Sequence, residues 1–580
     1  MLQRARLKLA ASRAPLVLAL FGTAAGVLSG LTIAAFRLLI ELPAARFMPQ
    51  GAAENFEALP AWQRAALPIA GAVVLAILYG LIGRDARKVG LVHVMQRLQF
   101  HEGVLPLKNL AVQFFAGAIS QVSGHSVGRE SPSIHLGAGV SSRLAQSVSL
   151  PSNAVRTLVA CGTAAGIAAS FNTPLAGVVF AMEVVMMEYT TAGFAPVILA
   201  AVAATAVTRA TFGDGHVFTV PPFGLVTLWE LGMITLLGVA CGALAAAFSQ
   251  LTRGMNRVLK RTSVFTRFLF AGAVCAAASL VAPEVLGLGY DTVNRTILGE
   301  YAAPALAVIV LAKLLATAAA VGAGLPGGLI GPALVMGACA GGAGAQVLEP
   351  VVGIQSSTGL FAMLGMGAMM SAVLQAPMAA LLAILELTGN PNLIMPAMLA
   401  VIAANLTYKE VLDRDSVIVQ LLGDEGYSLS EHPLAQSLAR VGVTAVMEPN
   451  VASLPQRVEA RRLAEVMRGA PAWLSVSNDE HQFILPAVDV ARFIETHPDV
   501  EEVDLAEVPA QRLAAVDVRM QSTLLTAHDL LLKTGAGAVR VLHRRGRVPG
   551  SARVLGVVLP RDIETHYIYR PATLPGGGAD

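Results

Sequence analysis

The chain has 580 residues, of which 55% are hydrophobic and only 14% are charged. Soluble globular proteins carry about 25% charged residues, so this composition argues against an ordinary soluble protein and favours one that spans a membrane. The formal net charge of +3 is too small to indicate binding to nucleic acid.

The first segment, residues 1–13, is basic: it contains four Lys or Arg residues and no acid, directly before a long apolar stretch. The positive-inside rule places such a segment in the cytoplasm. A cleaved signal peptide is the competing interpretation. It is disfavoured because the apolar stretch is too long and no convincing cleavage site follows it.

The next region, residues 14–424, is predicted to be an α-helical polytopic membrane domain. A helix needs about 20 mostly apolar residues to cross a bilayer. Several candidates are shorter than that, and many of the 55 glycines are spread through them. This pattern indicates tilted and interrupted helices around an internal site. The principal apolar stretches are Leu16–Ile40, Leu67–Ile82, Phe194–Val207, Val226–Phe248 and Ala305–Val321.

The C-terminal region has a different chemistry, because the high hydrophobic density ends near Leu422. We interpret residues 425–440 as a linker, residues 441–570 as a soluble α/β domain, and residues 571–580 as a disordered tail. Strand-like runs such as HQFILPAVDV and ARVLGVVL alternate there with helical runs such as QRVEARRLAEVMRG and TAHDLLLKTG. No metal site is expected in the chain, because its four cysteines lie in apolar segments without CxxC spacing.

An internal repeat runs through the membrane region. Residues 128–132 read GRESP and residues 328–332 read GLIGP, a shared G-x-x-x-P pattern at an offset of 200. The segment Gly162–Glu183 matches Gly365–Glu386 in its glycine, proline and glutamate positions, at an offset of 203. Ordered matches at nearly one offset predict a duplication, with halves at roughly 66–215 and 225–424.

The G-x-x-x-P pattern favours a sharp turn followed by a helix, because glycine permits the turn and proline fits the first helical turn. The free N–H groups at such a helix start, together with the helix dipole, attract an anion. Two of these elements could direct two positive helix ends at one buried anion. The alternative, kinked helices packed through small residues, also remains open.

The GRESP stretch resembles the G-[KR]-E-G-P motif of the CLC chloride channels and chloride/proton exchangers. Pro326–Ala338 resembles their GxFxP motif, and Gly162–Glu183 resembles the segment between these two motifs. The soluble tail resembles the paired CBS domains of many members. The resemblance covers about residues 14–570. It implies the CLC fold, with two inverted structural repeats and a cytoplasmic α/β CBS pair.

The resemblance also implies that the protein is a transporter and not an enzyme. Its expected partners are chloride or other small anions, protons in the exchangers, the lipid bilayer and a second copy of the chain. Each subunit of that homodimer would contain its own anion pathway. The expected location is the bacterial inner (plasma) membrane, with both termini in the cytoplasm.

The family's functional positions can be transferred residue by residue. Glu130 matches the gating glutamate, whose carboxylate competes with the anion and moves aside when it is protonated. The negative carboxylate is a plausible mimic of the anion, because the same helix dipoles attract both. The backbone amides expected to bind the anion belong to Gly128, Arg129, Glu130, Ser131, Leu329, Ile330 and Gly331.

Several positions depart from the family pattern. Ser131 stands where glycine is usual, and Ile330 replaces phenylalanine. The family's GSGIP motif aligns with Lys88–Val92, so Val89 replaces the anion-binding serine, and Ile418 replaces the pore tyrosine. Without these two hydroxyls, amides and dipoles would have to bind the anion. Two interpretations of Lys88 are open: it compensates for the missing hydroxyls, or it anchors the protein at the membrane edge.

A further departure concerns protons. The exchangers carry two acids after PLAG, and the second relays protons; here Glu183 matches the first and Val184 occupies the relay position. Because valine cannot carry a proton, we expect passive, channel-type conduction. Proton-coupled exchange remains the alternative, since water or Glu188 could serve as the relay. Glu183 and its repeat partner Glu386 are interpreted as structural acids that accept backbone hydrogen bonds.

The predicted CBS pair lacks hydroxyls that hold a ribose in related nucleotide sites. In such sites a Ser or Thr stands three residues before an Asp. Asp562 and Asp489 are both present here, but Leu559 and Pro486 stand where the Ser or Thr is expected. These substitutions argue against an adenine nucleotide, and we expect no other cofactor. We interpret the pair as a dimerising, gate-tuning module. A membrane sensor without transport is a remote alternative, which the intact Glu130 disfavours.

Overall fold

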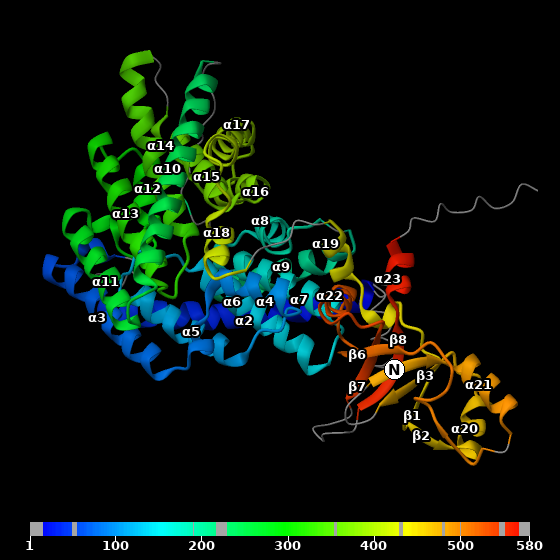
Figure 1. Cartoon of the computed structure of the whole chain (residues 1–580). Helices are drawn as coiled ribbons and strands as arrows, with labels where there is room; N and C mark the ends of the chain where they lie inside the picture. The colour runs from blue at the N-terminus through cyan, green and yellow to red at the C-terminus, as the bar shows by residue number, and fades with distance from the viewer. Residues whose placement is uncertain are drawn as a thin grey trace, which may run out of the picture. The chain divides into compact units, whose positions relative to one another are not determined.

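The computed structural model describes residues 15–48, 55–189, 191–215, 218, 229–352, 357–427, 433–477, 482–498, 500–544 and 552–567. The predicted basic N-terminus (1–13) and disordered tail (571–580) lie outside the described residues. The chain forms two compact units. The larger, Leu18–Val148 with Val155–Leu429, is helical, and the smaller, which includes Ser430–Asp580, combines helices and strands (Figure 1).

The helical unit contains two successive sets of helices, and in the described part of the chain nine helices are long and apolar enough to cross a membrane. The composition therefore predicted the class correctly. The first set is α2 (Pro15–Phe47), α3 (Ala61–Leu81), α4 (Gly90–Phe100), α5 (Leu107–Val122), α6 (Glu130–Ser147), α7 (Ser152–Phe171), α8 (Pro174–Phe180) and α9 (Thr191–Phe212).

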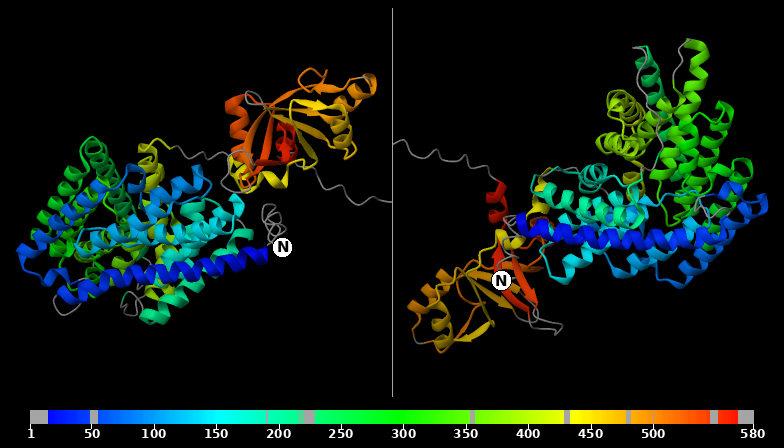
Figure 2. Two further views of the ribbon diagram at one scale, coloured as in Figure 1. Left: turned by 90° about the horizontal axis from the view of Figure 1, so that it is seen from below. Right: turned by 180° about the vertical axis from the view of Figure 1, so that it is seen from behind.

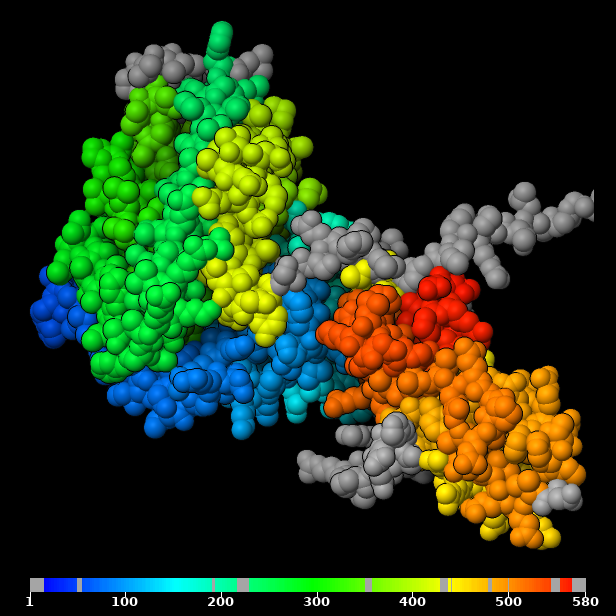
Figure 3. All heavy atoms as spheres, in the orientation of Figure 1, coloured from blue at the N-terminus to red at the C-terminus, as the bar shows by residue number. Residues whose placement is uncertain are grey.

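The second set is α10 (Glu230–Leu259), α11 (Val264–Val281), α12 (Tyr290–Ile297), α13 (Ala303–Ala323), α14 (Ile330–Val352), α15 (Thr358–Leu374), α16 (Pro377–Thr388), α17 (Ile394–Leu406) and α18 (Val417–Asp424). Wider π-helical turns extend α8 at Ala181–Met186 and α17 at Thr407–Val411. Short 3₁₀ turns occur at Phe56–Ala58, Arg84–Arg87, Pro283–Val285 and Pro391–Leu393. In Figure 3 the first set is blue to cyan, and the second, green to yellow, packs beside it.

The two G-x-x-x-P elements occupy equivalent places in these sets. Helix α6 begins at Glu130 and helix α14 begins at Ile330, each two residues after the first glycine of its motif. The two turns pair with each other: Gly128 N–H donates to the Gly328 carbonyl (2.8 Å), and Gly328 N–H donates to the Gly128 carbonyl (2.7 Å). The starts of α6 and α14 are therefore joined directly.

Close helix packing repeats at matching glycines. A side chain at Gly137 would overlap the Gly162 carbonyl, and one at Gly337 would overlap the Gly365 carbonyl. Glycine lets the backbones of α6 and α7, and of α14 and α15, approach within contact distance. The sequence repeat thus corresponds to a repeated packing arrangement.

Glu183 and Glu386 connect the two halves reciprocally. The Glu183 carboxylate accepts hydrogen bonds from the N–H groups of Met378 (3.2 Å) and Ala379 (2.8 Å), at the start of α16. Glu386 accepts two from the start of α8, at 2.9 and 2.8 Å. Each carboxylate satisfies N–H groups that lack partners within their own helix and faces its positive end. The prediction that both acids accept backbone hydrogen bonds is confirmed.

The smaller unit contains two successive β-α-β-β-α arrangements in one sheet of order β1-β3-β4-β6-β7-β8. In each arrangement the first pair of strands is parallel and the second is antiparallel. A separate antiparallel pair joins β2 to β5. The elements are α19 (Pro433–Arg440), β1 (Val451–Leu454), β2 (Arg457–Glu459), α20 (Ala460–Met467), β3 (Trp473–Ser477), β4 (Gln482–Pro486), α21 (Ala487–Thr496), β5 (Glu502–Asp504), β6 (Leu513–Arg519), α22 (Leu524–Thr534), β7 (Ala538–Arg544), β8 (Ala552–Val558) and α23 (Pro560–Tyr567). Further views are given in Figure 2.

One strand-like run in this unit is only partly a strand. HQFILPAVDV was expected to be extended, but β4 ends at Pro486 and α21 begins at Ala487. The apolar residues Val490, Phe493 and Ile494 have helical spacing and pack together in the core of this unit. This helical spacing of apolar residues continues past the quoted run, and it explains why the segment from Ala487 is a helix rather than a strand.

Candidate functional site

The Glu130 side chain lies where α6 and α14 begin. It is fully buried, and its carboxylate faces its own backbone N–H and that of Gly331. It leaves no room for a side chain at Gly128, and a β-carbon at Gly328 or Gly331 would lie 2.8 Å from a carboxylate oxygen. A buried negative charge is expensive unless donors and dipoles compensate for it. The convergence of two helix starts provides that compensation.

One side-chain donor also reaches this carboxylate. The Tyr290 hydroxyl, on the first residue of α12, donates to Glu130 Oε1 at 3.0 Å. The second oxygen, Oε2, accepts no geometrically regular hydrogen bond from the residues that the structure describes. The carboxylate thus lies in a donor-lined position, where Oε1 accepts the Tyr290 hydroxyl and Oε2 has no such partner among the described residues.

A cavity of about 280 Å³ lies beside the helix starts. Ser131, Leu329 and Ile330 line it together with Val89 and Ile418, so the fold brings together residues separated by more than 300 positions in the chain. Its charged lining is mainly basic: Arg87, Lys88, Lys260 and Arg267, against the acidic Glu425. We call this space the basic cavity. Such a lining raises the local concentration of anions.

Ser131 connects the basic cavity to α4. Its hydroxyl oxygen accepts a hydrogen bond from the Leu91 N–H (2.8 Å) in the first turn of α4, where Val89 at the N-cap provides no side-chain acceptor. Gly90 between them has a positive φ of 80°, and a β-carbon there would lie 2.9 Å from the Ser131 oxygen. A hydroxyl is therefore present beside Val89, although a different helix supplies it.

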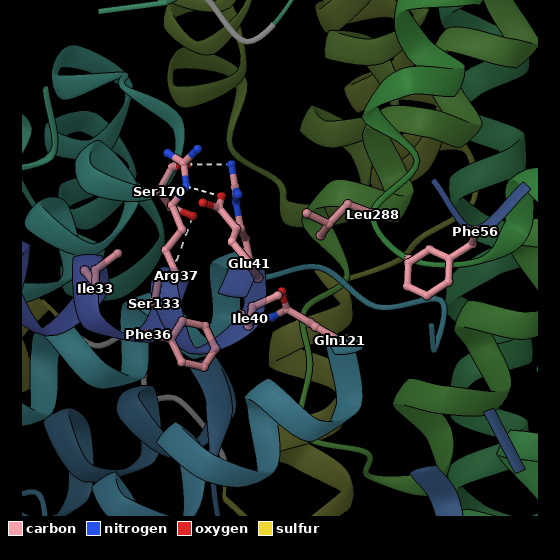
Figure 4. A pocket seen from close by; sticks show the side chains of 12 residues that line it. Ile33, Phe36, Arg37, Ile40, Glu41, Phe56, Gln121, Ser133, Ser170 and Leu288 are labelled. Atoms are coloured by element: carbon pink, nitrogen blue, oxygen red, sulfur yellow. Dashed lines mark hydrogen bonds and ion pairs between the residues drawn. The ribbon is translucent and has the colours of Figure 1, made fainter. Parts of the chain in front are cut away.

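A smaller cavity, of about 40 Å³, lies on the Arg129 side of the helix starts, and we call it the Arg129 cavity. The Arg129 guanidinium donates to the Ser170 carbonyl at 2.9 Å. Figure 4 shows the side chains around this space, including the Arg37–Glu41 ion pair of α2. Ser133, one turn into α6, also lines it. Arg129 and Ser131 flank Glu130 in sequence and line different cavities.

Two histidines lie next to the basic cavity. His93 of α4 lines it, and its Nδ1 lies 3.0 Å from Nε2 of the fully buried His135 of α6. The remaining His135 nitrogen has no partner among the described residues. A pair of imidazoles can pass a proton between nitrogens. Val184 of the proton-relay position is buried in the π-helical turn beyond α8 and is not among the residues lining either cavity.

The predicted site residues fall into three groups. Glu130, Gly128 and Gly331 meet at the carboxylate, as described above. The basic cavity contains Ser131, Leu329 and Ile330 with the substituted positions Val89 and Ile418, and Arg129 lines the smaller cavity. The motif residues therefore surround one point at the junction of the two repeats, while Val184 lies apart from both cavities.

Sequence reasoning missed Tyr290, His135 and the hydrogen bond made by Ser131. Tyr290 lies 160 positions from Glu130 in the chain and carries no motif. His135 is one of several polar residues in α6, and its nearness to His93 depends on how α4 and α6 pack. No local pattern in the sequence signals these contacts.

In the smaller unit, Asp562 has a local structural partner. Its carboxylate accepts a hydrogen bond from the Leu559 N–H (2.9 Å) just before α23. This contact has the capping-box geometry, in which an acid at the third helical position accepts from the N–H of the N-cap residue. Asp489 lies in the first turn of α21, where its negative charge suits the helix dipole. Both aspartates thus have a structural explanation that needs no nucleotide.

Comparison with known proteins places these features in context. A family model described as voltage gated chloride channel matches residues 70–409. A putative chloride channel protein ClcB-like of Ralstonia nicotianae is 34% identical over 369 residues, covering 62% of this chain and 85% of that protein. The H(+)/Cl(-) exchange transporter ClcA of Vibrio cholerae is 30% identical over 412 residues, covering 68% of this chain and 87% of that protein.

Solved structures show the same fold. A slow cyanobacterial Cl-/H+ antiporter matches with a TM-score of 0.61 at 22% identity, over 71% of this chain and 97% of that one. A eukaryotic CLC transporter matches with a TM-score of 0.60 at 18% identity, over 94% of this chain and 97% of that one. The second match extends over most of the chain and so includes much of the α/β unit.

Proposed function

The chain belongs to the voltage gated chloride channel (CLC) family, and from this premise we propose that it carries chloride and similar small anions across a membrane, with Glu130 as the gate. The observation that carries the proposal is the Glu130 carboxylate, fully buried at two converging helix starts and flanked by residues of two cavities. A chloride ion suits the same donors and dipoles. Movement of the carboxylate would open a path between the cavities.

In this proposal the anion enters through the basic cavity and binds beside Ser131 and Ile330. Backbone amides at the starts of α6 and α14 supply most of the donors, and the lysine and arginine side chains raise the local anion concentration. Lys88 lines the cavity, which supports the interpretation that it attracts anions. The remaining proposed amide donors belong to Arg129, Glu130, Leu329 and Gly331. The Gly128 N–H, which the motif also predicted as a donor, is already bonded to the Gly328 carbonyl.

Ser131 is proposed to replace the missing hydroxyl of position 89. Its oxygen already accepts the Leu91 N–H, so its single hydroxyl hydrogen remains able to point at an anion in the basic cavity. A hydrogen bond to a charged partner contributes about 1.5–3 kcal/mol. This contribution would restore part of what the Val89 and Ile418 substitutions remove.

Passive conduction is the mode that we propose. At the relay position Val184 has no proton to transfer, and the neighbouring Glu183 carboxylate is already hydrogen-bonded to two amides of α16. A proton arriving at Glu183 would have to compete with these bonds. Chloride movement is therefore proposed to proceed without a fixed number of counter-moving protons.

Proton-coupled exchange is the second candidate, and the His93–His135 pair favours it. His93 lines the basic cavity, and its partner His135 belongs to α6, the helix that begins with Glu130. The ClcA relatives are named as exchange transporters. If the histidines relay protons, the missing acid at Val184 would not prevent coupling.

One experiment separates the two modes. Purified protein is placed in liposomes loaded with potassium chloride, and the ionophore valinomycin lets K⁺ balance the charge of the moving chloride. An outward chloride gradient is applied, and chloride efflux and external pH are recorded together. Passive conduction predicts efflux with no uphill proton movement, and exchange predicts protons driven against their gradient. Empty liposomes are the control. Absence of any anion efflux above that control would contradict the transport proposal itself.

Further proposals concern the whole protein. The membrane-spanning helices support a multi-pass membrane protein, and we propose the bacterial inner membrane with cytoplasmic termini. We also propose a homodimer and interpret the duplicated β-α-β-β-α unit as a CBS pair that tunes the gate. An adenine nucleotide is not part of this proposal, because Leu559 and Pro486 lack hydroxyls. A sensor without transport is the remote alternative.

A further inference from the structure

Tyr290 is held in one place by contacts around its ring. The side chain is only 7% exposed, and its ring centroid lies 5.7 Å from that of Phe218 and 6.1 Å from that of Phe171. The Arg129 guanidinium lies 5.5 Å from the centre of the same ring. The hydroxyl therefore points at Glu130 from a ring with little freedom to turn away.

The backbone just before Tyr290 is also fixed. Lys313 of α13 is fully buried, and its Nζ donates to the carbonyls of Val285 and Gly287, both at 3.0 Å. Gly287 N–H donates to the Gly124 carbonyl at 3.2 Å, which ties the loop to the turn before α6. Because a buried lysine needs such partners, the loop and the lysine stabilise each other. Tyr290 thus starts α12 from a rigid support.

The hydrogen bond from Tyr290 depends on the charge of its acceptor. A hydroxyl that donates to an ionised carboxylate makes a stronger bond than one that donates to a neutral acid. Among the residues that the structure describes, the charged or titratable groups that face the Glu130 carboxylate are Tyr290 from α12 and Arg129 from the turn before α6. Both stabilise the ionised form in its buried position.

We propose that Tyr290 is a positioning residue that latches the ionised Glu130 carboxylate in the blocking position and releases it when the acid is protonated. This inference rests on the proposed gating function of Glu130. The latch is separate from the proposed anion contacts, because Tyr290 lines neither cavity, whereas Ser131 lines the basic cavity.

The test uses Tyr290→Phe, which keeps the ring contacts and removes only the hydroxyl. Chloride efflux from liposomes is measured from pH 4.5 to pH 8. Without this charge-assisted hydrogen bond the ionised carboxylate is less stable, so the gate opens at higher pH. Efflux at pH 7 should rise by about tenfold, and the pH at which efflux is half-maximal should rise by about one unit. A merely structural role would lower efflux without moving this profile.

Two controls accompany the variant. Tyr301→Phe removes another buried tyrosine hydroxyl, one without a hydrogen-bond partner in the described part of the chain, and should leave the profile unchanged. In a Glu130→Gln background the Tyr290→Phe change should add no more than about twofold, because the ionisable acceptor is gone. A tenfold increase that persists in that background would overturn the latch.

Bromide binding in detergent, measured by calorimetry, supplies a readout that needs no transport. Because the latched carboxylate competes with the anion, Tyr290→Phe should tighten bromide binding severalfold. If the wild type shows chloride efflux but Tyr290→Phe leaves the pH profile of efflux unchanged, as Tyr301→Phe should, the latch is overturned and the transport proposal is not. Absence of both wild-type efflux and bromide binding overturns the proposed function, and the latch with it.

Discussion

Replacement of Ser131 by alanine tests how this protein binds an anion without the usual hydroxyls. The side chain is 8% exposed and lines the basic cavity, and its oxygen accepts the Leu91 N–H at 2.8 Å. The change removes the proposed hydroxyl donor to the anion, which is worth about 1.5–3 kcal/mol. Each 1.4 kcal/mol is tenfold in affinity, so chloride should bind roughly 10- to 100-fold more weakly.

The same change also leaves the Leu91 N–H without its acceptor, which should cost about 1 kcal/mol of folding free energy. Ser142→Ala controls for this loss. Ser142 lies on the same helix, is fully buried, and its oxygen accepts the Leu105 N–H at 3.0 Å. It lines neither cavity. We expect this control to lower stability by at least as much while it leaves anion affinity within about twofold.

The assay is calorimetric titration of purified protein with chloride and with bromide, alongside thermal unfolding of each variant. Val89→Ser is the complementary variant. It returns a hydroxyl to the N-cap of α4, and anion binding should become severalfold tighter. If Ser131→Ala binds the anion with wild-type affinity while Ser142→Ala is destabilised as expected, Ser131 does not contact the anion directly, and the reasoning is refuted.

Three other predictions follow from named contacts. Glu130→Gln should flatten the pH dependence of chloride efflux, because the gate can no longer ionise; a profile unchanged from the wild type would contradict its gating role. Glu183→Gln should lower the melting temperature by weakening two hydrogen bonds to α16, with efflux per folded protein unchanged. A mutant melting temperature equal to that of the wild type would show that these bonds contribute little. Burial, and secondarily the charge of Asp291, raise the pKa of Glu57 to about 7 despite its ion pair with Arg295. The folded state therefore binds this proton more tightly than the unfolded state, and stability should fall as the pH rises from about 4.5 to 7. In Glu57→Gln this part of the pH dependence, followed by thermal unfolding, should disappear; its persistence would assign it to other groups.

Much of the architecture followed from local properties of the chain. Apolar stretches of spanning length predicted membrane helices, and the regular positions of glycine, proline and glutamate predicted the two matched halves. The pairing of Gly128 with Gly328 and the reciprocal bonds of Glu183 and Glu386 repeat that pattern in space. A duplicated sequence folds into duplicated elements because each half has the same turns and the same close packing positions.

Local pattern was less reliable where two periods compete. The run HQFILPAVDV contains both an alternating segment and the start of a helical one, and only packing of Val490, Phe493 and Ile494 in the core decides where β4 ends. The tertiary structure also decided which side chains surround the gate. Tyr290, Ser131 and His135 meet their partners across helices, and hydrophobic spacing along one helix carries no information about the polar group that a neighbouring helix presents.

The amino-acid sequence alone therefore determined the membrane class, the repeat and the position of Glu130, because hydropathy and the turn-forming residues act locally. The tertiary structure alone decided that the hydroxyl absent at Val89 is present on Ser131 and that Tyr290 faces the Glu130 carboxylate. Both contacts join segments that are distant in the chain. Their distances depend on how α4, α6 and α12 pack, which is a property of the whole helical unit.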